Sequence, residues 1–243
     1  MNKKIQIAML AAILALVMLL SACGVPTLKY DAAQKGYVRN SDGIVFRAAP
    51  QNYVAAAMDT ENPIAKLVLE DKKLNVYTVC GTENGTDMDT NVWLADEEYK
   101  LYCADGTVLP KLWEMQVNRI SILQNTTEAF GMGRVTDADE IATVVDAYQN
   151  GPTYSAVDLR HVIALLTYRT DYNKYTLSFS SANYAGLCYT LTFYHFESDV
   201  YLTPDGSDEE PVNVGKNIIL DPETGLCYAV RGVFDVFFHK SAE

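Results

Sequence analysis

The segment Thr136-Asp-Ala-Asp-Glu-Ile-Ala-Thr-Val-Val-Asp-Ala-Tyr-Gln-Asn150 carries the strongest helical signal of the chain. Its apolar residues recur at i, i+3, i+4 and i+7, the spacing of one helix face; they are Ile141, Val144, Val145 and Tyr148. Thr136 is placed to cap the first turn, and the acidic residues that follow favour the positive end of the helix dipole. Gly151 and Pro152 are typical of a helix end. The sequence therefore predicts a helix over about 137–149.

Strands surround this helix on both sides. Residues 174–180 alternate between large apolar side chains and hydroxyls, and 187–196 continue in the same way. Further strands are predicted at 44–46, 65–69, 74–80, 91–94, 99–104, 117–123, 200–202, 216–220 and 226–230, with a hairpin turn at 70–73. We expect a helical turn over 51–58 and a short C-terminal helix over 234–239, while 161–168 fits either a buried strand or a short helix. The predicted fold class is α+β, predominantly an antiparallel β-sheet with one well-defined helix.

The N-terminus has the pattern of a secretory signal. Lys3 and Lys4 precede the uncharged segment 5–20, whose 16 residues are fewer than the roughly 20 that a transmembrane helix needs. The sequence Leu20-Ser-Ala-Cys23 resembles the lipobox of bacterial lipoproteins. The resemblance implies cleavage before Cys23 and attachment of diacylglycerol to its thiol. We therefore expect a protein of the cell membrane, lipid-anchored on its extracytoplasmic face.

The regions that follow from this cleavage are a signal peptide (1–22), a flexible tether (23–40), a β-rich N-terminal region (41–115) and an α+β region (116–243). Cleavage leaves 17 basic and 31 acidic residues, a formal net charge of −14. Such an excess repels nucleic acid, so no nucleic-acid partner is expected. The segment 116–239 is similar to domains in uncharacterised lipoproteins of Gram-positive bacteria. That similarity implies an extracytoplasmic domain and assigns no catalytic residues.

Four cysteines remain besides Cys23. Their even number and the oxidising compartment permit disulfides, and Cys80–Cys103 with Cys188–Cys227 is the pairing that adjacent strands favour. The alternative is four buried thiols.

The acidic segment 87–98 has the spacing of a calcium loop. Oxygen ligands would come from the side chains of Asp87, Asp89, Asn91 and Glu98. Val92 stands where such a loop needs glycine, and no helix flanks the segment, so a solvated acidic turn is the preferred interpretation. The prediction is no metal and no cofactor.

Catalytic motifs are missing from the sequence. His161, His195 and His239 belong to no recognisable catalytic motif, and the odd offset between Cys188 and His195 sends their side chains to opposite faces of one strand. We expect His195 to be a packed or strand-edge residue.

The neighbouring strands 174–180 and 187–196 share a hydroxyl-rich face with one aromatic ring. Its members are Thr176, Ser178, Thr190, Thr192 and Tyr194. This face is the predicted binding face, the alternative being a plain solvated sheet. The predicted function is a noncatalytic module that binds a protein or a glycan at the cell envelope. The alternative is an envelope hydrolase that cleaves a wall or surface polymer through a carboxylate pair.

Overall fold

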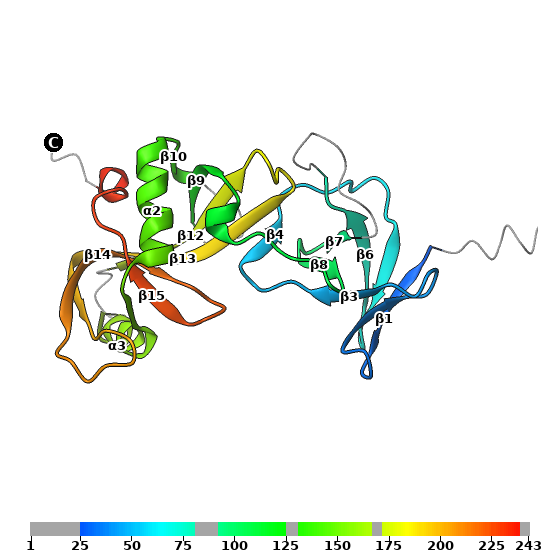
Figure 1. Ribbon diagram of the computed structural model, residues 1–243, viewed down its shortest axis with the longest axis horizontal. Coiled ribbons are helices and arrows are strands. Elements are labelled where there is room, and N and C mark those ends of the chain that lie inside the picture. The colour runs from blue at the N-terminus through cyan, green and yellow to red at the C-terminus, as the bar shows by residue number, and fades with distance from the viewer. Residues whose placement is uncertain (1–24, 81–91, 125–130, 167–171, 239–243) are drawn as a thin grey trace, which may run out of the picture.

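The computed structural model describes residues 25–80, 92–124, 131–166 and 172–238. The described chain is mostly β with two α-helices, which confirms the α+β class (Figure 1). Seven strands close into a barrel in the order β1-β2-β3-β8-β7-β6-β5. They are β1 (Thr27–Asp31), β2 (Gly36–Arg39), β3 (Val45–Ala48), β5 (Ala65–Val68), β6 (Lys73–Thr78), β7 (Trp93–Asp96) and β8 (Leu101–Ala104).

The barrel corrects the prediction of a plain antiparallel sheet. Its closure comes from β1 and β5, which pair in parallel with Leu28 beside Leu67. A parallel pair joins segments that are distant in sequence, and local alternation cannot encode such a pair. The predicted hairpin between β5 and β6 is confirmed, with the two strands antiparallel on either side of the 70–73 turn.

The predicted tether is wrong over most of its length, because β1 and β2 form a hairpin within 23–40. In β1, Leu28 is the one residue classed as buried. A strand with one inward residue shows no sustained alternation, so its sequence resembles a linker.

The second sheet has the order β10-β9-β12-β13-β14-β15-β11, and its neighbouring strands run antiparallel. Its strands are β9 (Val117–Gln124), β10 (Gly131–Val135), β11 (Thr153–Ser155), β12 (Tyr172–Ser181), β13 (Leu187–Leu202), β14 (Val212–Leu220) and β15 (Leu226–Ala229). The strand β4 (Tyr53–Ala55) leaves the barrel region and pairs with the start of β13. The predicted helical turn at 51–58 is therefore wrong, since pairing with β13 outweighs the helical propensity of an alanine-rich segment.

The predicted helix is confirmed as α2 (Ala138–Asn150). Its N-cap is Asp137 rather than Thr136, and the Asp137 carboxylate accepts hydrogen bonds from the backbone N–H groups of Asp139 and Glu140. The ambiguous segment after it contributes to a second helix, α3 (Ala156–Leu166). In place of the predicted C-terminal helix there is one 3-10 turn, η2 (Asp235–Phe237), and a similar turn, η1 (Leu112–Glu114), precedes β9.

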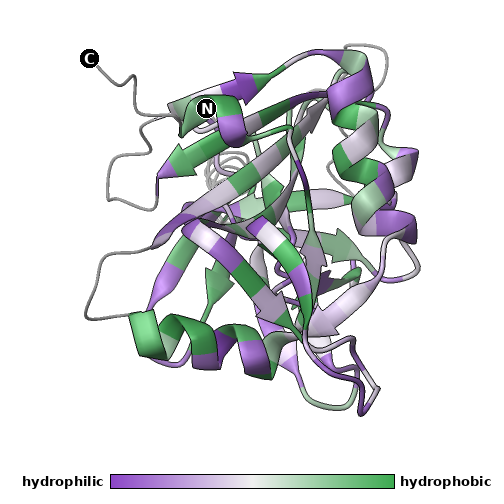
Figure 2. Ribbon diagram, turned by 90° about the vertical axis from the view of Figure 1, so that its left-hand side faces the viewer, coloured by the Kyte–Doolittle hydropathy of each residue, from purple (hydrophilic) through white to green (hydrophobic). Residues whose placement is uncertain are grey.

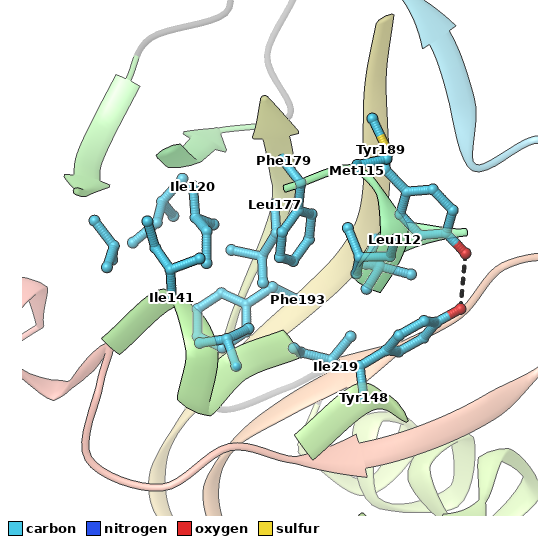
Figure 3. Packing of buried hydrophobic residues seen from close by; sticks show 14 of the residues in the cluster. Leu112, Met115, Ile120, Ile141, Tyr148, Leu177, Phe179, Tyr189, Phe193 and Ile219 are labelled. Atoms are coloured by element: carbon cyan, nitrogen blue, oxygen red, sulfur yellow. Dashed lines mark hydrogen bonds between the residues drawn. The ribbon is translucent and has the colours of Figure 1, made fainter. Parts of the chain in front are cut away.

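The two helices cover opposite faces of the second sheet (Figure 2). Leu191 and Phe193 of β13 belong to the cluster that includes the buried face of α2, whereas Tyr194 and Phe196 pack with the residues beneath α3. The α2 cluster, part of which Figure 3 shows, also contains barrel residues such as Leu101. Some barrel residues therefore pack against the second sheet, whereas others form a separate cluster that includes Leu28, Phe46 and Leu94.

At this junction Gly186 lies directly against the end of β6. A Cβ atom at Gly186 would lie 2.0 Å from the carbonyl oxygen of Cys80. This backbone contact leaves no space for a side chain.

The structure contains neither predicted disulfide. Cys80 follows β6 and Cys103 lies on β8, but β7 runs between these strands, so two strand spacings, about 9.5 Å, separate them. Disulfide-linked Cα atoms lie within about 7 Å. The second predicted pair fails in a similar way, because Cys227 and its neighbour Leu220 align with Thr192, four residues along β13 from Cys188. Burial raises the pKa of the Cys103 and Cys227 thiols to about 12, which keeps them protonated and unreactive.

Candidate functional site

Two adjoining depressions lie where β13, β14 and the C-terminal turn meet. The first, the His195 groove, has a volume of about 510 Å³ and is lined by Met132, Asn173, His195, Glu197, Lys216, Asp235 and Phe238. The second, the Arg231 hollow, has a volume of about 460 Å³ and is lined by Asp199, Asn213, Gly215, Lys216, Asn217, Val230, Arg231, Gly232 and Asp235. The two share Lys216 and Asp235, so they form one continuous candidate site.

A chain of hydrogen bonds holds the floor of the His195 groove. His195 Nδ1 lies 2.8 Å from Asn217 Oδ1, and Asn217 Nδ2 donates to Asp235 Oδ1 at 2.6 Å. The carboxylate of Asp235 accepts, which fixes the orientation of the Asn217 amide and makes His195 Nδ1 the donor. Asn217 is 2 % exposed, so this chain anchors the groove to the core.

Aromatic packing fixes the His195 ring from one side. Phe238 stacks on it with ring centroids 4.1 Å apart and an interplanar angle of 17°. The turn that carries Phe238 packs against β10, where a Cβ atom on Gly133 would lie 2.4 Å from Phe237 Cδ1. The absence of a side chain at Gly133 therefore lets the C-terminal turn form the wall of the groove. These contacts confirm that His195 is a packed residue.

The register of the β13–β14 pair is irregular at the site. His195 and Asn217 are direct partners, but the pairing then shifts, so that Val200 lies opposite Gly215. Gly215 has a φ of +83°, a conformation that favours glycine. Bulges of this kind bend a strand and re-aim its side chains. Here the irregular positions Asp199 and Gly215 themselves line the Arg231 hollow.

The described lining of the site offers amides, carboxylates and cations but no Ser, Thr, Tyr or Cys side chain. It therefore lacks a hydroxyl or thiol nucleophile. Within the described ranges, no group of three or more His, Cys, Asp and Glu side chains is placed to hold a metal ion. The arrangement supplies fixed donors and acceptors beside an aromatic surface, which is the chemistry of ligand binding.

The predicted binding face is assembled but largely covered. Thr176 lies opposite Thr192 and Ser178 opposite Thr190, so the two strands are adjacent as predicted. Ser178, however, is buried, and Tyr194 is 8 % exposed. The ring of Tyr194 contacts Tyr172 and Phe196, and it belongs to the cluster beneath α3.

Tyr194 is therefore placed in the core and not on the surface of the predicted binding face. The physical reason is α3, whose apolar side covers this end of the sheet and which the sequence did not distinguish from a strand. The Thr190 hydroxyl is also engaged, because it donates to the carbonyl oxygen of Asn52 at 3.3 Å.

The predicted lipidation residue Cys23 and the candidate calcium-loop residues Asp87, Asp89 and Asn91 lie outside the described residues, as does His239. Of the calcium loop, Glu98 is described, and its carboxylate forms an exposed ion pair with Lys72 at 2.5 Å. No helix in the described part of the chain is long and apolar enough to cross a membrane.

A second cluster of polar groups is buried at the junction between the barrel and the second sheet. Asn52 Nδ2 donates to Asp221 Oδ1 and to Tyr189 Oη, both at 2.8 Å. Tyr148 Oη donates to Asp221 Oδ2 at 2.9 Å and lies 2.7 Å from Tyr189 Oη, a contact drawn in Figure 3. Since Asp221 is 1 % exposed, we interpret this cluster as a structural lock.

The electrostatics of the lock follow from its hydrogen bonds. Burial acts to raise the pKa of Asp221, but the hydrogen bonds from Asn52, the Glu223 backbone and Tyr148 together outweigh it, and the pKa lies below its usual value. Burial, with the hydrogen bonds to Tyr189 and Asp221, raises the pKa of Tyr148. The lock therefore consists of a carboxylate and neutral hydroxyls at neutral pH.

No protein-family model matches the chain, and neither a curated protein nor a solved structure matches it. The fold and the groove therefore carry the functional argument.

Proposed function

We propose that this protein is a lipid-anchored, extracytoplasmic and noncatalytic module that binds a protein or a glycan of the cell envelope, and that the His195 groove is its binding site. The observation that carries the proposal is the groove's lining of oriented polar groups, which includes no hydroxyl or thiol nucleophile among the described residues. Oriented polar groups in a concave surface give specificity to a binding site.

The position of the groove fits such an anchor. Thr27, the first residue of β1, follows Cys23 by four residues, which span at most about 14 Å. A lipid on Cys23 would thus keep the barrel close to the membrane. The elements that form the groove lie at the opposite end of the long axis from β1 (Figure 1). The groove would then face away from the bilayer, toward the wall or the outer surface.

The lining favours a glycan over a protein. Sugar hydroxyls both donate and accept hydrogen bonds, and the groove offers both kinds of partner in Asn173, Glu197 and His195. Protein interfaces bury an apolar centre instead. The apolar side chains of this groove are Met132 and Phe238.

One observation favours the hydrolase alternative. Glu197 and Asp235 line the same groove, and glycosidases use two carboxyl groups about 5 to 9 Å apart. Asp235 already accepts a hydrogen bond from Asn217, and so we place binding first. A decrease in the chain length of an envelope glycan with the wild type, but not with Glu197→Gln, would establish hydrolysis in place of binding alone.

We expect groove variants to capture less envelope material. Full-length protein in detergent, immobilised and incubated with solubilised envelope, should lose about fivefold in capture with Asn173→Ala and with Glu197→Ala, since each removes a hydrogen-bonding group worth about 1 kcal/mol. Lys174→Ala is the matched control, because Lys174 is exposed and pairs with Tyr194 on the other face of the sheet. Equal capture by all four proteins would contradict the proposed site.

A further inference from the structure

Two positively charged side chains, Lys216 and Arg231, line the Arg231 hollow. Neither forms an ion pair with a carboxylate of the described chain. The ion pairs of the described residues are Arg39–Asp42, Arg47–Asp105 and Lys72–Glu98, all in the barrel. Both carboxylates of the hollow instead accept from neutral amides: Asp199 from Asn213 Nδ2 at 2.9 Å, and Asp235 from Asn217 Nδ2. We propose that Lys216 and Arg231 receive a carboxylate group of the ligand, so that the bound polymer is an acidic glycan. This inference rests on the proposed function.

The guanidinium of Arg231 is held in place by the chain itself. Arg231 Nη2 donates to the carbonyl oxygen of Asn213 at 2.7 Å. Asn213 is fixed in turn, because its Oδ1 accepts from the Gly215 backbone N–H at 2.8 Å and its Nδ2 donates to Asp199. One of the five N–H donors of Arg231 is thus used within the described chain, and an oriented guanidinium fork matches a carboxylate geometrically. Lys216 adds a second positive charge on the shared border with the His195 groove.

The surrounding charge favours a carboxylate over a phosphate monoester. Asp199 and Asp235 lie in the same hollow, and the whole chain is strongly acidic. Their repulsion grows with the charge of the ligand group, and a phosphate monoester carries nearly two negative charges at neutral pH. A phosphodiester carries one charge, as a carboxylate does, and the poly(glycerol phosphate) probe of the test compares the two directly. A singly charged carboxylate gains the contact with Arg231 at a smaller electrostatic cost.

The backbone beside the hollow favours a sugar over an acidic peptide. Extended peptides bind by adding a strand to an open sheet edge. Beside the hollow, the pairing of β14 is irregular at Gly215. The carbonyl oxygen of Asn213, which an added strand would need as an acceptor, already accepts a hydrogen bond from Arg231. The groove next to the hollow can accommodate the uncharged part of a sugar ring against Asn173 and Glu197.

The test uses full-length protein in detergent and measures its affinity for four probes: a galacturonate oligomer, a galactose oligomer of the same length, poly(glycerol phosphate) and a poly-glutamate peptide. We expect the galacturonate oligomer to bind about tenfold more tightly than the galactose oligomer, as one charge-assisted contact gives. Lys216→Gln and Arg231→Gln should each remove most of that difference. Lys174→Gln, on the other face, should keep it.

Lys216→Gln remains informative if Arg231→Gln perturbs the loop, since the Lys216 side chain has no hydrogen bond or ion pair to lose in the described chain. Equal affinity for the two sugar oligomers would overturn the carboxylate subsite and leave envelope capture untouched. Tighter binding of poly(glycerol phosphate) or of poly-glutamate, lost in the same variants, would overturn the choice of an acidic glycan. An absence of galacturonate binding by a protein that still captures envelope material would also overturn it.

Discussion

Replacing Asp221 with alanine is expected to lower the free energy of unfolding by about 3–5 kcal/mol, because it leaves buried donors without an acceptor. Asn52 Nδ2, Tyr148 Oη and the Glu223 backbone N–H all donate to this carboxylate. Asn52 comes from the segment before β4, and Tyr148 comes from α2, so the loss weakens the junction between the barrel and the second sheet. Urea denaturation followed by circular dichroism measures the effect.

Asp208→Ala is the matched control for this prediction. Asp208 is exposed in the loop between β13 and β14, and its replacement should change the stability by less than about 0.5 kcal/mol. A change of similar size in both variants would contradict the assignment of Asp221 as the acceptor of the lock.

The same carboxylate determines the expected pH dependence. The pKa of folded Asp221 lies below the usual value of 3.8, so its contribution to stability is complete above that value and is lost as the pH falls through the lower folded pKa. The wild type should therefore lose stability below about pH 4 more steeply than Asp221→Ala does.

The second large effect is expected at the anchor. With Cys23 replaced by alanine, the protein should carry no lipid and should leave the detergent phase, because each buried methylene contributes about 0.8 kcal/mol to membrane binding and two acyl chains give stable anchoring. Radiolabelled fatty acid and detergent phase partitioning measure the two consequences. Cys188→Ala is the control, and it should keep both the label and the detergent partitioning. A labelled, membrane-bound Cys23→Ala protein would contradict lipidation at this residue.

The elements that the sequence predicted correctly are those set by local pattern. The helix α2 follows from the period of Ile141, Val144 and Tyr148, and the β5–β6 hairpin follows from two alternating segments around a charged turn. The barrel closure, the path of β4 and the burial of Tyr194 depend on contacts between distant segments. None of these has a local pattern, and the two disulfide predictions failed for the same reason.

The candidate site was predictable only in part. His195 was recognised as a packed residue, but its partners Asn217 and Asp235 lie 22 residues and more away in the sequence, and their meeting depends on the β13–β14 register. One signal was present: Asn217 lies inside the predicted strand 216–220, immediately before the apolar residues Ile218 and Ile219. A polar residue inside such a strand needs a buried partner.

The central claim, that envelope ligands bind in the groove at the β13–β14 end of the molecule, is tested most directly by mapping the contact. Isotope-labelled full-length protein in detergent micelles would be titrated with solubilised envelope glycan while its backbone amide resonances are recorded. We predict shifts concentrated at 195–199, 213–217 and 230–235. Shifts confined to the hydroxyl face at 176–178 and 190–192, or to the barrel, would contradict the account.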